Sequence, residues 1–188
     1  MKKLIAVCLP TLLLSACVIH LSHSAAAEDL NHEERQLQLN AAGLTELKAE
    51  TEAGDLKIIG VKGLNQIEVS ADLYSSEDRP FTLSLEKQGS AAVLKAIGGA
   101  CTGICTGSSA YADLIVKVPA ELALTLQDGS GDLQIEGLSA DLVIEDGSGN
   151  VTLQGGNNLV LEDGSGNASL TQLTGNLSVE DGSGDLFI

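Results

Sequence analysis

The stretch DGSGDLQIEGLSADLVIE, residues 128–145, decides the fold, because its opening phrase returns three more times in the chain. DGSG occupies residues 128–131, 146–149, 163–166 and 181–184, at intervals of 18, 17 and 18 residues. An Asp or an Asn follows the phrase each time. Residues 128–188 are therefore three full units and the beginning of a fourth.

Each full unit contains two short runs in which apolar and polar residues alternate. A period of two is typical of strands with one buried face. Aliphatic residues supply most of the apolar positions, since the chain has two Phe, two Tyr and no Trp. The inward-facing positions that this alternation predicts are Leu133/Ile135, Val151/Leu153, Ala168/Leu170 and Leu186/Ile188 in the first run, and Leu142/Ile144, Leu159/Leu161 and Leu177/Val179 in the second.

Self-similarity at a short, fixed period predicts a solenoid, in which each coil buries its apolar positions by stacking on the next. The predicted fold class is all-β: a single-stranded parallel β-helix (β-solenoid) with about 17–18 residues per coil in the C-terminal half. An antiparallel meander or sandwich with hairpin turns at DGSG is the alternative. The phrase returns after every second strand, as coils require and hairpins do not.

DGSG is predicted to form the corner of each coil, because Gly accepts positive φ and Asp, Ser and Asn bond to nearby backbone. The corner residues are Asp128, Gly129, Gly131, Asp146, Gly147, Gly149, Asp163, Gly164, Gly166, Asp181, Gly182 and Gly184. The four aspartates should stack as one column, with Asp132, Asn150, Asn167 and Asp185 as a second column nearby. Stacked carboxylates repel each other, so calcium at Asp128, Asp146, Asp163 and Asp181 is a secondary hypothesis beside plain turn chemistry.

The first seventeen residues, MKKLIAVCLPTLLLSAC, have the order of a secretion signal: a basic start, an apolar run and then small residues. The end of this segment resembles the lipobox of bacterial lipoproteins, which implies cleavage before Cys17 and lipid attachment to it. By the same resemblance, Val18 favours the outer membrane. Cleavage after Ala27, leaving a soluble periplasmic protein, is the alternative.

Two further cysteines, Cys101 and Cys105, lie in the segment CTGIC. In an oxidising envelope compartment this pair predicts a small structural disulfide. The histidines, at positions 20, 23 and 32, fall in or near the leader, so no zinc site and no other cofactor are predicted.

The segment before the repeats divides into a polar tether at residues 18–35 and the beginning of the folded domain, residues 36–188. Strand-like alternation occurs at Leu37/Leu39, Leu47/Ala49, Leu56/Ile58 and Ile67/Val69. A less regular pair of strands is predicted around Gln88-Gly89-Ser90, and YADLIVKVP, residues 111–119, is predicted to be a strand that ends at Pro119.

The run YADLIVKVPAELALTLQDGSGDLQIEG, residues 111–137, resembles the bacterial DUF4097/DUF2807 group of β-strand-repeat proteins, often labelled adhesins. Upstream, AETEAGDLKIIGVKGLNQIEVSADLY, residues 49–74, is similar to the start of those domains. The likeness extends over roughly residues 43–188. It implies a right-handed β-helix on the cell envelope and brings no catalytic residues with it.

The chain has 26 acidic and 10 basic residues, a formal net charge of −16, which disfavours nucleic acid as a partner. The preferred function is an envelope-anchored, non-catalytic adhesin-like or scaffolding protein, tethered to the membrane by its lipid and bound to an unidentified envelope or surface partner. End-to-end self-association through the last coil is a further expectation. A sensory or regulatory envelope protein is the alternative. A carbohydrate-active enzyme is disfavoured because residues 128–188 contain no Lys, Arg or His.

Overall fold

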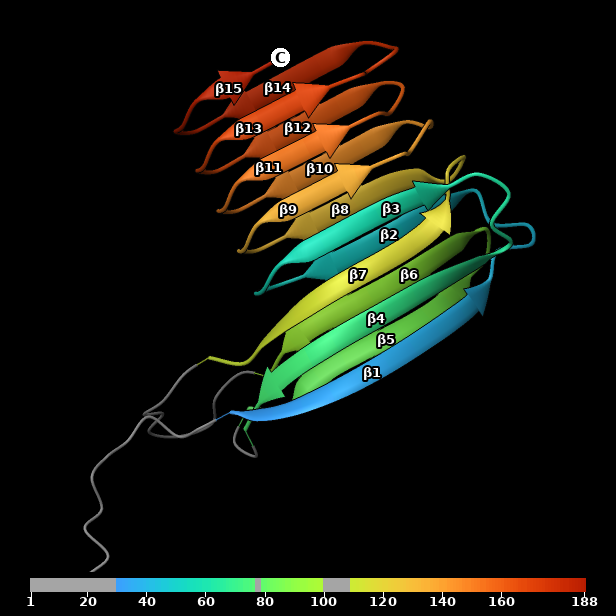
Figure 1. The fold of residues 1–188 in the computed structure, drawn as a ribbon, viewed down its shortest axis with the longest axis vertical. Coiled ribbons are helices and arrows are strands. Elements are labelled where there is room, and N and C mark those ends of the chain that lie inside the picture. Colours follow the sequence, from blue (N-terminus) through green and yellow to red (C-terminus); the bar gives the residue numbers. More distant parts are fainter. Residues whose placement is uncertain (1–29, 77–78, 100–108) are drawn as a thin grey trace, which may run out of the picture.

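A computed structural model describes residues 30–76, 79–99 and 109–188, and in these ranges the chain forms strands and turns without a helix. Two sheets of eight and seven strands lie face to face along the long axis (Figure 1). The strands are β1 (Asn31–Asn40), β2 (Glu46–Thr51), β3 (Leu56–Val61), β4 (Gln66–Ser75), β5 (Phe81–Gln88), β6 (Ala91–Gly98), β7 (Tyr111–Pro119), β8 (Ala123–Asp128), β9 (Leu133–Glu136), β10 (Leu142–Asp146), β11 (Val151–Gln154), β12 (Leu159–Asp163), β13 (Ala168–Thr171), β14 (Leu177–Asp181) and β15 (Leu186–Phe187).

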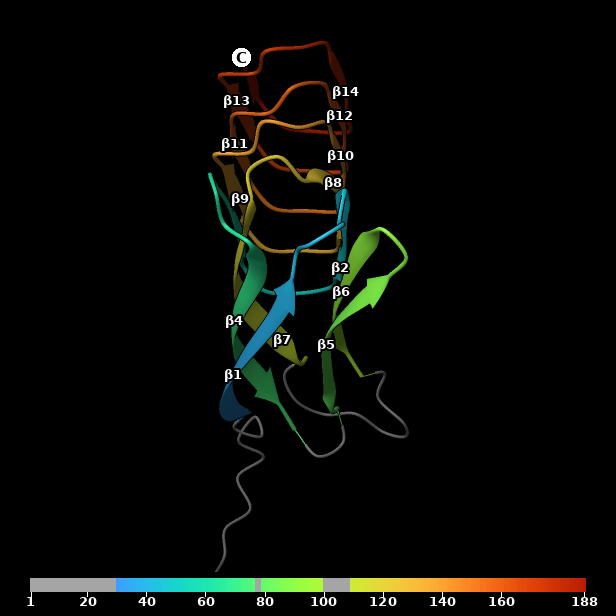
Figure 2. The same ribbon diagram turned by 90° about the vertical axis from the view of Figure 1, so that its right-hand side faces the viewer.

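From β8 onward the chain crosses to the other sheet after every strand, as the turns between the sheets in Figure 2 show. Each strand is parallel to the strand two places later, in the register that the repeat spacing predicts. Leu142, for example, faces Leu124 on one side and Leu159 on the other. Equivalent residues of successive repeats therefore form columns, and the predicted column of DGSG aspartates runs from Asp128 through Asp146 and Asp163 to Asp181.

Apart from Leu177 and Val179 on β14, which are partly buried, the predicted inward positions of the first three repeats are buried between the sheets. Ile144 and Leu153, for example, are at most 1% exposed. The fourth repeat differs, because its predicted inward positions Leu186 and Ile188 are 40% and 79% exposed. The alternation of apolar and polar residues therefore predicts the buried positions correctly where a further repeat covers them.

Strands β2 and β3 extend the same stack from the other side, although they precede the repeats in the chain. β2 is parallel to β8 and β3 is parallel to β9. Thr51 occupies the position of Asp128 in this coil, and the turn after it, residues 52–55, corresponds to the DGSG corner. Strands β6 and β7 then pair in parallel with β2 and β3.

The expectation of parallel pairing throughout residues 36–188 is wrong for the first half. β4 is antiparallel to both β1 and β7, and β5 is antiparallel to β6. The physical reason is the direction that the chain takes after the strand. Short turns at Gly63 (φ +75°) and Gly89 (φ +65°) send the chain back within the same sheet, whereas a coil requires it to cross to the other one. Both sheets are consequently mixed.

The boundary of the predicted tether also needs correction. β1 begins at Asn31 and its register with β4 runs without interruption from Asn31 to Asn40. Residues 31–35 therefore belong to the fold, because they complete the edge of the eight-stranded sheet. The signal segment, Cys17, Cys101 and Cys105 lie outside the described residues. Among residues 30–76, 79–99 and 109–188, no helix is long and apolar enough to cross a membrane.

The DGSG corners use their two glycines in different ways. The second glycine has positive φ in all four copies, as at Gly149 (φ +137°). The first does not, so the expectation of positive φ at Gly147 is wrong. Gly147 is instead needed for space, because a Cβ on it would collide with the carbonyl oxygen of Gly129 in the neighbouring coil.

Candidate binding surface

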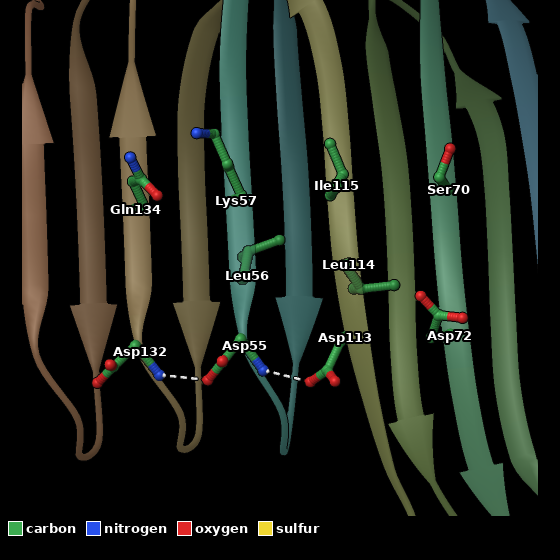
Figure 3. Close-up of a pocket in the computed structure, with 10 residues that line it drawn as sticks. All are labelled: Asp55, Leu56, Lys57, Ser70, Asp72, Asp113, Leu114, Ile115, Asp132 and Gln134. Carbon is green, nitrogen blue, oxygen red and sulfur yellow. Dashed lines mark hydrogen bonds between the residues drawn. The ribbon is translucent and has the colours of Figure 1, made fainter. Parts of the chain in front are cut away.

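A row of five carboxylates crosses the outer face of the eight-stranded sheet. Glu34 on β1 faces Asp72 on β4, and Asp72 faces Asp113 on β7. The backbone N–H of Asp55 donates to Asp113 Oδ1 at 3.0 Å, and that of Asp132 donates to Asp55 Oδ1 at 3.0 Å (Figure 3). We call Glu34, Asp72, Asp113, Asp55 and Asp132 the acidic row.

The acidic row continues into the repeats as the second column that the sequence predicts. Asp132 Oδ1 accepts hydrogen bonds from the backbone N–H and the side-chain amide of Asn150, at 3.1 and 3.0 Å. Asn150 and Asn167 in turn accept the backbone N–H groups of Asn167 and Asp185. One side-chain oxygen per coil thus binds the next coil, and Asn serves this purpose as well as Asp.

A shallow groove of about 440 Å³ lies beside the acidic row, and Figure 3 shows four of the five carboxylates at its edge. The groove also contains Lys57, Ser70 and Gln134. The Lys57 ammonium lies 3.1 Å from Glu136 Oε1, so it is already paired outside the acidic row. Within the described residues, Asp72 is the only member of the row in contact with a basic side chain, the His32 imidazole, whose Nε2 lies 2.8 Å from Asp72 Oδ1. The surface is therefore suited to bind cations.

An aromatic stack stands directly beside the acidic row, two residues further along the strands. His32 lies on Tyr74, with ring centroids 4.7 Å apart and an interplanar angle of 17°. Tyr74 lies on Tyr111 at 4.5 Å and 12°. The register of β1, β4 and β7 brings the three rings together. This stack fixes the His32 ring on the same face as the carboxylates.

The DGSG aspartates form a separate acidic column, which is buried between the sheets. Asp128, Asp146 and Asp163 are 6%, 3% and 4% exposed, because they continue the inward-facing alternation of their strands. The Thr51 hydroxyl donates to Asp128 Oδ1 and so covers one end of the column. Both oxygens of Asp146 are buried without a hydrogen-bond partner among the described residues. The expected bonding to turn amides holds in part, because the backbone N–H of Gly129 lowers the pKa of Asp128, whereas Asp146 lacks such a bond.

Burial has a large effect on the protonation of this column. It raises the pKa of Asp146 to about 7, and the charges of Asp128 and Asp163 add to the shift. Burial also raises the pKa of Asp128, while the hydrogen bond from Thr51 acts in the opposite direction. A protonated carboxyl can donate to the next carboxyl in the column, so we expect shared protons to relieve the repulsion. Calcium at these residues stays a prediction.

Sequence reasoning missed His32 and every member of the acidic row except Asp132. Asp55 and Asp113 precede Leu56 and Leu114 just as Asp132 precedes Leu133, so the repeated Asp-Leu dipeptide was the available signal. His32 was assigned to the tether and discounted as a ligand. In the structure, ligand atoms of His32, Glu34 and Asp72 lie within 4.8 Å of one another.

No protein-family model matches the sequence, and a search of curated proteins gives no match. Among solved structures, the fold is similar to that of a "putative cell adhesion protein" from Clostridium sporogenes, with a TM-score of 0.51 and 9% identity over 84% of this chain and 99% of the other. At this identity the likeness concerns the fold alone.

Two proteins of Parabacteroides distasonis are more distant in structure. A "putative lipid binding protein" has a TM-score of 0.46 and 24% identity, covering 79% of this chain and 62% of the other. A "putative adhesin" has a TM-score of 0.40 and 15% identity, covering 79% and 65%.

Proposed function

We propose that this protein is an envelope-anchored, non-catalytic β-solenoid that binds a cationic partner through its acidic row, in an adhesin-like or scaffolding role. The observation that carries the proposal is a set of five carboxylates beside an open groove of about 440 Å³. Three of them lie on β1, β4 and β7, and two lie directly before β3 and β9. Charges of one sign on a rigid face attract and orient a partner of the opposite sign.

The chemistry of the row supports binding over catalysis. Each of Asp113, Asp55 and Asp132 has one oxygen engaged with the backbone of the next strand, which holds the side chain in place. We assign no catalytic residue to this surface. The fold likeness to the "putative cell adhesion protein" is in keeping with a surface role for this chain.

Anchoring is the second part of the proposal. A lipid on Cys17 would hold the membrane end, and the fold begins at β1. Fully extended, residues 18–30 would place Asn31 up to about 45 Å from that lipid. Metabolic lipid labelling and membrane fractionation of the wild type and Cys17→Ala test this part. Loss of label and of membrane association is expected in the variant, and unchanged membrane association contradicts lipid anchoring.

The binding surface is tested with an immobilised octalysine peptide as the probe. The variant Asp55→Asn/Asp113→Asn/Asp132→Asn removes three charges and keeps the side-chain oxygens that accept hydrogen bonds, as Asn150 and Asn167 already do. The control is Glu145→Gln/Glu162→Gln/Glu180→Gln, which removes three charges from a stacked column on the outer face of the other sheet.

The two triple variants have the same net charge, so only the position of the lost carboxylates differs. We expect the first to weaken peptide binding at least tenfold and the control to change it less than twofold, with steeper salt dependence for the wild type. Equal weakening by both variants, or no binding by the wild type, overturns the proposal.

A further inference from the structure

His32, Glu34 and Asp72 bring three potential metal ligands to one place on the outer face of the eight-stranded sheet. His32 and Glu34 are two residues apart on β1 and so point to the same side. Asp72 faces Glu34 from β4. One ligand atom of each residue lies within 4.8 Å of the others, and His32 Nε2 is 2.8 Å from Asp72 Oδ1. All three side chains are exposed, so an ion can reach them.

The scaffold under these side chains is rigid. β1 and β4 are paired over ten residues in continuous register, so the three Cα positions are fixed by backbone hydrogen bonds. The stack of His32 on Tyr74, itself stacked on Tyr111, restricts the imidazole ring. A ligand set that is held in place before the ion arrives loses little conformational entropy on binding.

The ligand types select the class of ion. One imidazole nitrogen and two carboxylates suit Zn²⁺ or Cu²⁺, whereas Ca²⁺ and Mg²⁺ prefer oxygen ligands alone. Bonds of about 2.1 Å in a tetrahedral site place the ligand atoms about 3.4 Å from one another. His32 Nε2 and Asp72 Oδ1 therefore move slightly apart from 2.8 Å, and any pair near the 4.8 Å limit moves closer. Three protein ligands leave a coordination position for water or for a group of a partner. The remaining carboxylates of the acidic row, from Asp113 onward, raise the local concentration of cations.

We propose that His32, Glu34 and Asp72 form a surface site for a divalent transition-metal ion of the Zn²⁺ or Cu²⁺ class. The ion replaces the direct contact between His32 and Asp72 and takes Nε2 and a carboxylate oxygen as ligands. Tyr74 is a positioning residue for the imidazole. The site shares Glu34 and Asp72 with the acidic row, but metal binding does not require a cationic partner at Asp55, Asp113 and Asp132.

The two tyrosines of this chain provide a direct probe, because the sequence has two Tyr and no Trp and both tyrosines belong to the stack beside His32. Cu²⁺ bound at His32 should therefore quench most of the intrinsic fluorescence. The experiment uses the full chain without a histidine tag, under non-reducing conditions. His20→Gln and His23→Gln are present throughout, which leaves His32 as the single histidine.

Cu²⁺ titrations followed by fluorescence and Zn²⁺ titrations followed by calorimetry are compared among variants. We expect one ion per chain, at least 30-fold weaker binding in His32→Gln, and about tenfold weaker binding in Glu34→Gln and Asp72→Asn. Glu33→Gln is the matched control, since Glu33 is adjacent on β1 and pairs with Arg35 instead. It should bind within twofold of the parent.

Three results overturn the site: no quenching and no heat up to 1 mM metal, unchanged binding in His32→Gln, or equal weakening in Glu33→Gln and Glu34→Gln. Circular dichroism of each variant ensures that the comparison is made between folded proteins. Because the octalysine variants leave all three ligands intact, loss of peptide binding and loss of metal binding are separate outcomes.

Discussion

The two halves of the molecule cover their apolar faces by different strand pairing. In the repeats, β8 to β15, every pair is parallel and each coil buries the one before it. In the first half, hairpins and returning strands place β1, β4 and β5 antiparallel to their neighbours. The repeats therefore depend on identical close contacts between coils, whereas the first half depends on individual turns. A substitution should be more damaging where the contact recurs in every coil.

The glycines offer the strongest test of this difference. In Gly149→Val, the new Cβ would overlap the carbonyl oxygen of Gly131 at a residue with φ of +137°, so both backbone strain and a clash oppose it. We expect a loss of about 4 kcal/mol or more in the free energy of unfolding. Gly63→Ala in the first half has positive φ but open space around the new Cβ, and should cost about 1 kcal/mol. Urea denaturation of both variants is the measurement, and equal losses would contradict the contrast.

Core truncation should give the next largest difference. Ile144 is 1% exposed between two coils, so Ile144→Ala should lower the free energy of unfolding by about 3 kcal/mol. Leu37 on the edge strand β1 is only partly buried against the core, and Leu37→Ala should cost about 1 kcal/mol. Both losses are measured by chemical denaturation, with the same dependence of the unfolding free energy on denaturant concentration for the two variants. A larger loss for Leu37→Ala would mean that β1 carries more of the stability than its burial indicates.

The buried Asp146 and the exposed Asp141 should respond to pH in opposite directions. The folded-state pKa of Asp146, about 7, lies above its ordinary value of 3.8, so the folded protein holds this proton more tightly than the unfolded chain. The stabilising contribution is complete below about pH 4 and is lost as the pH rises towards 7. We expect the melting temperature of the wild type to fall by several degrees between pH 5 and 7.5, and Asp146→Asn to reduce this slope.

Asp141 provides the control for this pH dependence. The backbone and side-chain amides of Asn158 and the side-chain amide of Asn157 lower the pKa of Asp141, so its contribution is present above its ordinary pKa and is lost on acidification. Asp141→Asn should leave the slope between pH 5 and 7.5 unchanged. A wild-type slope that persists in Asp146→Asn would show that the buried column does not hold the protons.

The smallest effect on stability is expected in the column of Asp132, Asn150, Asn167 and Asp185. There, only the side-chain oxygen that accepts a hydrogen bond contributes to stability. Asp132→Asn keeps the acceptor for Asn150 and should leave the melting temperature within about 1 °C. Asp132→Ala removes that acceptor and should cost about 1 kcal/mol. Thermal melts at pH 7 compare the two. If both variants are equally unstable, the negative charge is needed as well as the oxygen.

Periodicity alone was enough to identify the apolar columns and the stacking of the aspartates, because like residues recur at 17 or 18 positions and must meet in successive coils. The burial of Asp128 was also available from the sequence, since it continues the alternation of Leu124 and Leu126. The interpretation of DGSG as a corner, and not also as the end of a strand, concealed this burial. A short motif can be both the end of a strand and the beginning of a turn.

The other parts of the fold and of the candidate site depend on pairing between distant segments. A single sequence contains no local signal for such pairing. Thr51 meets Asp128 across 77 residues, and no repeat links their surroundings closely enough to predict the contact. His32 belongs to the site only because β1 extends to Asn31 along β4. Neither contact was predicted, because each depends on the register between strands that are far apart in the sequence. That register is determined by the packing of the whole sheet.

The position of β1 has a consequence for mechanical load. β1 is an edge strand, and β4 is its sole partner within its sheet. A chain anchored through its N-terminus and pulled at the far end of the stack would feel force across the strands, along the long axis in Figure 1. Such a force opens the β1–β4 hydrogen bonds one after another, starting at Asn31 and Ser75, instead of shearing all of them together. Peeling of this kind requires little force, so β1 would yield before the coils and lengthen the tether under tension.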